Sequence, residues 1–206
     1  MDTIEIWVER IGGLAGMVVL GAALLGIWRA SMRGRGRETG QAHRMLRTTT
    51  YLLIGIPYFL ACTLLWKPLP FSFISFEMHA STLVFGSLFY FSGLVLYQWA
   101  WFALGRYYNV SSGLGVRLFA EHQLITGGPY ALIRHPMYGG LQMAAFGGVF
   151  LFRTWTFVFL FVNFLFLTIR ARREEQALAM EYPGQWERYC RDVPAWFPKL
   201  SRGKSG

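Results

Sequence analysis

The sequence predicts an all-α, polytopic membrane protein built as a helical bundle. Hydrophobic residues make up 54% of the 206 residues and charged residues only 15%. An ordinary soluble domain has about 25% charged residues, so this chain has too little ionic surface for that class. The apolar residues also form long runs separated by short polar stretches, which is typical of membrane-spanning helices. We therefore expect about five transmembrane helices, the last two forming a C-terminal helical hairpin.

The charge distribution favours membrane lipids over nucleic acid as partners. The net charge is +9, but the basic residues lie beside apolar segments and form no separate basic domain. Anionic headgroups and membrane topology account for such a pattern, so no nucleic-acid partner is expected. The two cysteines, Cys62 and Cys190, are far apart in the sequence. They indicate neither a disulfide framework nor a metal site, and no metal is expected.

The first three spans set the predicted topology. The first, at 11–28, follows an acidic stretch where a signal peptide would be basic, so we expect it to be retained. An arginine-rich loop follows at 29–47, and the positive-inside rule places it in the cytoplasm, with the N-terminus outside and the C-terminus cytoplasmic. The second and third spans are 50–66 and 81–104. The small size and the lack of a retrieval signal favour a bacterial inner membrane.

The remaining apolar stretch, 137–169, predicts the hairpin. It is too long for one crossing and short for two, since a crossing needs about 20 residues. Arg153 and Thr154 interrupt it, so we expect the tip at 152–155 and both feet, at His135 and Arg170, on the cytoplasmic side. The first arm carries four small residues that allow close approach either of a helix or of a ligand: Gly139, Gly140, Gly147 and Gly148.

Two polar blocks, 122–138 and 170–175, flank this hairpin and are candidate site segments. In the first, proline follows His135 where a helix would begin, and the unpaired N–H groups of a helix start can bind an anion or carboxylate. In the second, Arg170 and Glu174 share a helix face and are one turn apart. Residue spacing leaves two interpretations open: a membrane anchor with a simple ion pair, or a binding site.

The order of these residues resembles the isoprenylcysteine carboxyl methyltransferase family. The resemblance covers about the C-terminal half of the chain, and the first two spans carry no part of it. It is carried by Leu104-Gly-Arg106, His122-Gln-Leu-Ile-Thr-Gly-Gly-Pro-Tyr130, Arg134-His-Pro-Met-Tyr138 and Glu174-Glu175, followed by Leu178, Gly184, Tyr189, Val193 and Pro194. The chain departs from the family at Glu181-Tyr-Pro-Gly-Gln-Trp186, where Pro183 should break the tail helix, so neither Tyr182 nor Trp186 is assigned a ligand.

The resemblance implies an integral membrane enzyme that binds S-adenosylmethionine in a cytoplasmic pocket formed by its C-terminal helices. Residues 1–104 would form three N-terminal spans, and 105–206 the catalytic region. Arg170 would be catalytic, holding the acceptor substrate, and Glu174 would bind the polar end of the cofactor. The other implied cofactor-binding residues are His122, Gln123, Leu124, Ile125, Tyr130, Arg134, His135, Pro136, Met137 and Tyr138.

The expected function is therefore methyl transfer to a lipophilic small-molecule or lipidated acceptor, with carboxyl O-methylation of an isoprenylcysteine-like substrate favoured. A carboxylate acceptor is already ionised at neutral pH and requires no general base. Three alternatives stay open: S- or N-methylation of a lipophilic thiol or phospholipid amine, an NADPH enzyme resembling membrane sterol reductases, and a membrane scaffold without catalysis. No oligomeric state is predicted.

Overall fold

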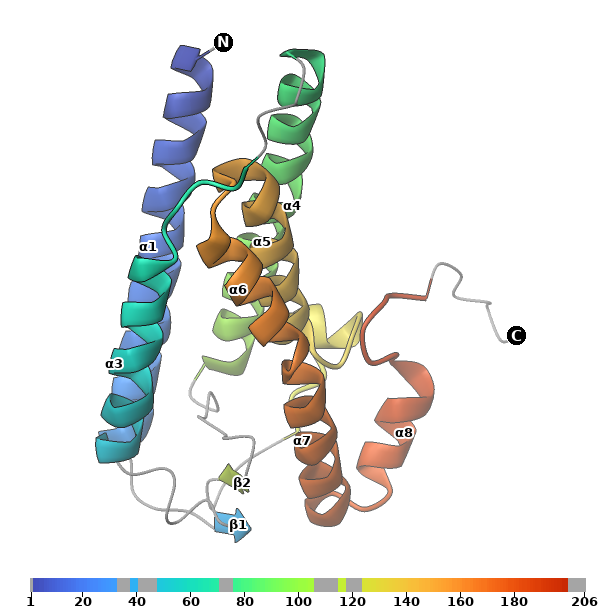
Figure 1. Cartoon of the computed structure of the whole chain (residues 1–206). Helices are drawn as coiled ribbons and strands as arrows, with labels where there is room; N and C mark the ends of the chain where they lie inside the picture. The colour runs from blue at the N-terminus through green and yellow to red at the C-terminus, as the bar shows by residue number, and fades with distance from the viewer. Residues whose placement is uncertain are drawn as a thin grey trace.

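The computed structural model describes residues 2–32, 38–40, 48–70, 76–105, 115–117 and 124–199. Its helices are α1 (Asp2–Met32), α3 (Thr48–Leu64), α4 (Phe76–Leu104), α5 (Pro136–Phe152), α6 (Trp155–Leu165), α7 (Leu167–Glu181) and α8 (Gln185–Asp192), with a 3-10 turn η2 (Gly128–Ala131). Two short strands, β1 (Glu38–Gly40) and β2 (Gly115–Arg117), pair antiparallel at one end of the bundle (Figure 1). Helices supply most of the buried core of the described residues, so the predicted all-α class is confirmed.

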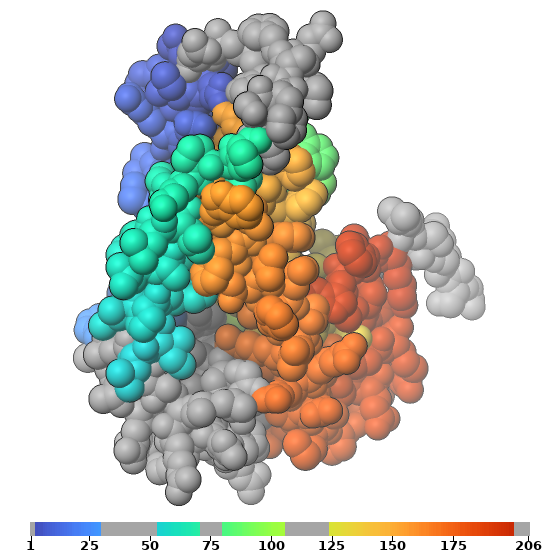
Figure 2. All heavy atoms as spheres, viewed as in Figure 1, coloured from blue at the N-terminus to red at the C-terminus, as the bar shows by residue number. Residues whose placement is uncertain are grey.

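Three helical stretches among the described residues are long and apolar enough to cross a bilayer. They are Thr3–Arg29, Ala80–Leu104 and Trp155–Glu181, and Leu53–Leu64 is a shorter apolar helix. Helix α3, which lies along α6 in Figure 2, exposes large side chains such as Leu53, Ile56 and Phe59. Such surfaces are stable in hydrocarbon, and the chain is an integral membrane protein. The count of five crossings stays a prediction.

The predicted hairpin is present as α5 and α6, and its tip lies where the sequence placed it. Helix α5 ends at Phe152, Arg153 adopts a left-handed conformation with φ of 48°, and α6 begins at Trp155. The tip pairs with the segment after α3, since the Leu69 N–H donates to the Arg153 carbonyl at 2.7 Å and the Trp155 N–H to the Lys67 carbonyl at 3.1 Å. The tip and the connection after α3 therefore lie at the same end of the bundle.

Glycines set the distance between α4 and α5, which form the most extensive helix pair. A Cβ atom on Gly147 would lie 2.3 Å from the backbone nitrogen of Tyr90, and one on Gly140 would lie 2.7 Å from the carbonyl oxygen of Gly93. Of the two interpretations of the first-arm glycines, helix packing therefore holds for Gly140 and Gly147. Gly148 is likewise covered, by the ring of Phe157 on α6.

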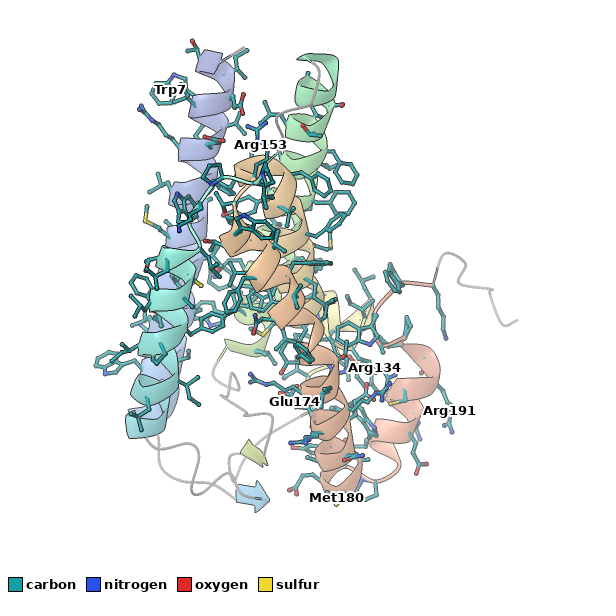
Figure 3. The ribbon with its side chains drawn as sticks, viewed as in Figure 1. Trp7, Arg134, Arg153, Glu174, Met180 and Arg191 are labelled. Atoms are coloured by element: carbon teal, nitrogen blue, oxygen red, sulfur yellow. The ribbon has the colours of Figure 1, made fainter. Side chains whose placement is uncertain are left out.

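An ion pair connects the hairpin tip to the N-terminal helix α1. The Arg153 guanidinium forms an ion pair with Glu5 and lies 3.7 Å from an oxygen of Glu9, both on α1. The side chains of Arg153 and Glu5 are each only 15% exposed, so these charges are largely removed from solvent. This Arg153 cluster lies at the end of the bundle opposite β1 and β2 (Figure 3).

Two substitutions at Arg153 should distinguish the effect of its charge on stability from the effect of its backbone conformation. Both Arg153→Ala and Arg153→Gly remove the ion pair, but only glycine occupies the left-handed region without strain. The alanine variant should therefore be less stable than the glycine variant by about 1 kcal/mol. Urea unfolding in detergent micelles measures the difference, and equal stability of the two variants would contradict the assignment of strain.

Candidate functional site

The polar blocks meet where the start of α5, the helix α7 and the short helix α8 come together. Arg134 and Glu174 both lie at the end of the hairpin away from Arg153 (Figure 3). Helix α5 begins at Pro136 with His135 at its N-cap position, as the sequence predicted. Helices α7 and α8 are separated by a turn in which Gly184 has φ of 78°. The predicted helix break near Pro183 is confirmed, and it turns α8 back toward the start of α5.

One half of the site is a largely buried triplet formed by Arg134, His135 and Glu175. The imidazole Nε2 of His135 lies 2.8 Å from Oε1 of Glu175, and a guanidinium nitrogen of Arg134 lies 3.1 Å from the same oxygen. The side chain of His135 is only 6% exposed and that of Arg134 16%. Hydrogen bonds to a carboxylate in such surroundings are strong and fix the geometry of both partners. Glu175 thus holds both basic residues at the start of α5.

The other half of the site is centred on Glu174. The Tyr138 hydroxyl donates to Oε1 of Glu174 at 2.5 Å, and Nε of Arg170 lies 3.5 Å from that oxygen. The Arg170 guanidinium also lies over the Tyr138 ring, 5.5 Å from its centroid. Arg170 and Glu174 form the ion pair that their one-turn spacing predicted, and Tyr138 links them to α5.

Helix α8 closes the far side of the triplet. Trp186 and Tyr189 are buried, and the Arg134 guanidinium lies 5.7 Å from the centroid of the Trp186 ring. The Tyr189 hydroxyl donates to the carbonyl of Tyr130 at 2.7 Å. Burial is the main cause that raises the pKa of Tyr189 above its ordinary value, so the phenol stays protonated and keeps this hydrogen bond.

Five of the residues assigned to the site are brought together: Arg134, His135, Tyr138, Arg170 and Glu174. Among the other assigned residues, Tyr130 and Pro136 are buried, whereas Leu124, Ile125 and Met137 are half-buried. Leu124 packs against the buried cluster of α8. His122 and Gln123 lie outside the described residues. The roles of all these residues stay predictions.

Sequence reasoning assigned no role to Glu175, although Glu174-Glu175 is part of the family resemblance. Consecutive residues on a helix point in directions about 100° apart, which is why the two carboxylates have different partners. Glu174 meets Tyr138 and Arg170, whereas Glu175 meets Arg134 and His135. The adjacent pair of acidic residues was the available signal, but the partners of Glu175 are distant in sequence.

Cys190 is a further partner of Arg134 that the sequence did not indicate. A guanidinium nitrogen of Arg134 donates to Sγ of Cys190 at 2.8 Å. Burial is the largest cause raising the pKa of this thiol, although Arg134 opposes it. Because the thiolate is the nucleophile, a raised pKa leaves less of it at neutral pH.

The raised pKa of Cys190 predicts slow alkylation. In a Cys62→Ser background, alkylation of Cys190 by iodoacetamide should be slower than that of a free thiol at pH 7.5 and should accelerate only at higher pH. Alkylation at the free-thiol rate would contradict this.

The part of the chain that contains the candidate site is similar to a known protein family. Residues 85–180 match the model of the Isoprenylcysteine carboxyl methyltransferase (ICMT) family. The resemblance to this family is confirmed over those residues. The ICMT match includes α5 and nearly all of α7, and it covers all the residues of the triplet and of the Glu174 group. Helix α8 and the segment after it lie beyond its end.

Two curated proteins are similar to parts of this chain. The Protein-S-isoprenylcysteine O-methyltransferase of Schizosaccharomyces pombe is 34% identical over 82 residues, which are 39% of this chain and 35% of that protein. The Cobalt-zinc-cadmium resistance protein CzcN of Cupriavidus metallidurans is 36% identical over 89 residues, 41% of each chain. The matched part of the chain thus spans less than half the length of each of these two relatives.

Proposed function

We propose that this protein is an S-adenosylmethionine-dependent methyltransferase of the membrane, acting on a lipophilic acceptor. The observation that carries the proposal is the meeting of Arg170, Glu174 and Tyr138 with Arg134 and His135 inside the region that matches the ICMT family. The named activity of the Schizosaccharomyces pombe relative supports an isoprenylcysteine-like acceptor and transfer to oxygen.

The chemistry of the donor set fits S-adenosylmethionine, whose polar end carries an ammonium and a carboxylate. Glu174 offers a carboxylate to the ammonium group. The first turn of α5 leaves N–H groups without helical partners, and these suit a carboxylate. Arg134 adds one more donor, because its buried Nε hydrogen-bonds to no atom of the described residues. An unpaired buried donor is costly, and a bound carboxylate would satisfy it.

The reaction requires alignment more than acid or base catalysis. When bound, S-adenosylmethionine supplies a methyl group on a positively charged sulfonium sulfur. Arg170 would hold one oxygen of the acceptor carboxylate by a charge-assisted bond and leave the other directed at that methyl carbon. The new C–O bond forms as the C–S bond breaks with its electron pair left on sulfur, and no proton is transferred. The apolar helices around the site would exclude water.

In this proposal the acceptor and the cofactor approach from different phases. Arg170 lies in the first turn of α7, directly after exposed apolar residues such as Phe166 and Ile169. A lipophilic acceptor would reach Arg170 from the bilayer, whereas the cofactor would enter from the cytosol. We accordingly propose that α7 and α8 are cytoplasmic. An external N-terminus and a bacterial inner membrane as host stay predictions from the sequence.

Methyl transfer from labelled S-adenosylmethionine tests the proposal. Purified protein in lipid nanodiscs would receive a panel containing a prenylcysteine acid, the corresponding methyl ester, an alkyl thiol and phosphatidylethanolamine. The proposal predicts label on the prenylcysteine acid, released by base as methanol, and none on its ester. Label on the thiol or the amine alone would indicate S- or N-methylation in place of carboxyl methylation. Absence of label on all acceptors, together with no cofactor binding by calorimetry, would contradict methyltransferase activity.

A further inference from the structure

The segment that follows α8 returns to the candidate site and forms one of its sides. The N–H of Arg134 donates to the carbonyl of Pro194 at 2.9 Å, and the N–H of His135 donates to that of Ala195 at 3.2 Å. Val193, one residue earlier, is buried against Trp186 and Tyr189. We call residues 193–196 the C-terminal strap. In Figure 1 this segment runs from the end of α8 back toward the start of α5.

The last residue of the strap, Trp196, contacts His135. The ring of Trp196 lies 5.2 Å from the His135 imidazole, centroid to centroid, with 32° between their planes. The imidazole also stacks on Tyr138, at 5.8 Å between centroids and 13° between the planes. His135 thus contacts two aromatic rings, and its Nε2 lies 2.8 Å from Oε1 of Glu175. Each ring contact of this kind is favourable and also restricts the rotation of the imidazole.

Trp196 is much less exposed than its neighbour in the chain, Phe197. Phe197 is 84% exposed, whereas Trp196 is half-buried against the site. The strap also lies beyond residue 180, where the match to the ICMT family ends. The family match therefore gives Trp196 no role, and its contact with His135 is a feature of this structure.

We propose that Trp196 is a positioning residue, which acts through His135 to hold the cofactor-binding geometry at the start of α5. The inference rests on the proposed function, since it concerns the same site. With Trp196 in place, the imidazole cannot swing away from Glu175, and Glu175 keeps Arg134 beside the first turn of α5. Without that ring, one face of His135 opens to solvent and the triplet loosens.

The first measurement is independent of the cofactor. Diethyl pyrocarbonate modifies accessible histidines, and peptide mass spectrometry resolves His135 from the other three histidines of the chain. Modification of His135 should be slow in the wild type, because its side chain is 6% exposed. It should be about tenfold faster in Trp196→Ala, the size of a lost ring contact. It should stay slow in Trp196→Phe and in the matched control Phe197→Ala.

The second measurement connects this geometry to the cofactor. In Trp196→Ala the KM for S-adenosylmethionine should rise about tenfold, with kcat changed less than about twofold, because the reacting groups stay in place. Trp196→Phe should restore the wild-type KM. Unchanged His135 reactivity in Trp196→Ala, or an equal effect from Phe197→Ala, would overturn the inference. A wild type that does not bind S-adenosylmethionine, with His135 still shielded by Trp196, would instead contradict the proposed function and leave the shielding established.

Discussion

Replacing Glu174 by alanine is expected to weaken S-adenosylmethionine binding about 50-fold, the equivalent of about 2.3 kcal/mol for a lost charged hydrogen bond. The carboxylate is held in place by the Tyr138 hydroxyl at 2.5 Å and by Arg170 at 3.5 Å, so it is already directed when the cofactor arrives. Calorimetric titration with the cofactor measures the change. Equal affinity in Glu174→Ala and wild type would contradict the assignment.

Arg170→Ala should give the opposite kinetic pattern. Because the Tyr138–Glu174 bond remains, cofactor affinity should change less than about threefold, whereas kcat should fall about 100-fold through loss of acceptor alignment. Tyr138→Phe is the matched control, since it removes the hydroxyl from Glu174 and keeps the ring beneath Arg170. It should weaken cofactor binding only a few-fold. Loss of affinity in Arg170→Ala equal to that in Glu174→Ala would show that the two residues have no separate roles.

Substitution of Gly147 by alanine is expected to cause the largest loss of stability. The added Cβ would lie 2.3 Å from the nitrogen of Tyr90 and 2.6 Å from the carbonyl oxygen of Gly86, and neither backbone atom can move without separating α4 from α5. Overpacking of this kind costs about 3 kcal/mol. Thermal unfolding in detergent, followed by circular dichroism, measures the loss.

Gly139→Ala is the control for that substitution, because it adds the same methyl group to the same helix. Among the described residues, the nearest neighbour of its Cβ would be Cδ1 of Ile133 at 3.7 Å, an ordinary contact. Since alanine favours a helix over glycine by about 1 kcal/mol, stability should be unchanged or slightly higher. A similar loss in both variants would mean that backbone freedom, and not the approach of α4, determines the effect at Gly147.

The hairpin was predictable because its chemical signal is local. Polar Arg153 and Thr154 interrupt an otherwise apolar stretch, and the structure turns there. The contact of α4 with α5 was not predictable to the same degree, since both helices are apolar on every side and periodicity shows no buried face. The glycines indicated close approach, and only the packed structure shows that Gly147 meets α4 while Gly139 does not.

The contacts of the candidate site were likewise predictable only in part. Arg170 and Glu174 are one helical turn apart, so their pairing follows from the sequence alone. The partners of Glu175 lie on another element, and the contact of Trp196 with His135 depends on where α8 directs the chain after Gly184. Contacts between elements distant in sequence are set by tertiary packing, which local spacing does not contain.

The central claim is that the start of α5 and the facing side of α7 bind S-adenosylmethionine. Ultraviolet cross-linking of the radiolabelled cofactor to purified protein, followed by peptide mapping, tests this most directly. The account predicts label in peptides from 124–138 or 170–175, abolished by excess unlabelled cofactor and strongly reduced in Glu174→Ala. Label confined to α1 or α3, or no label that unlabelled cofactor displaces, would contradict it.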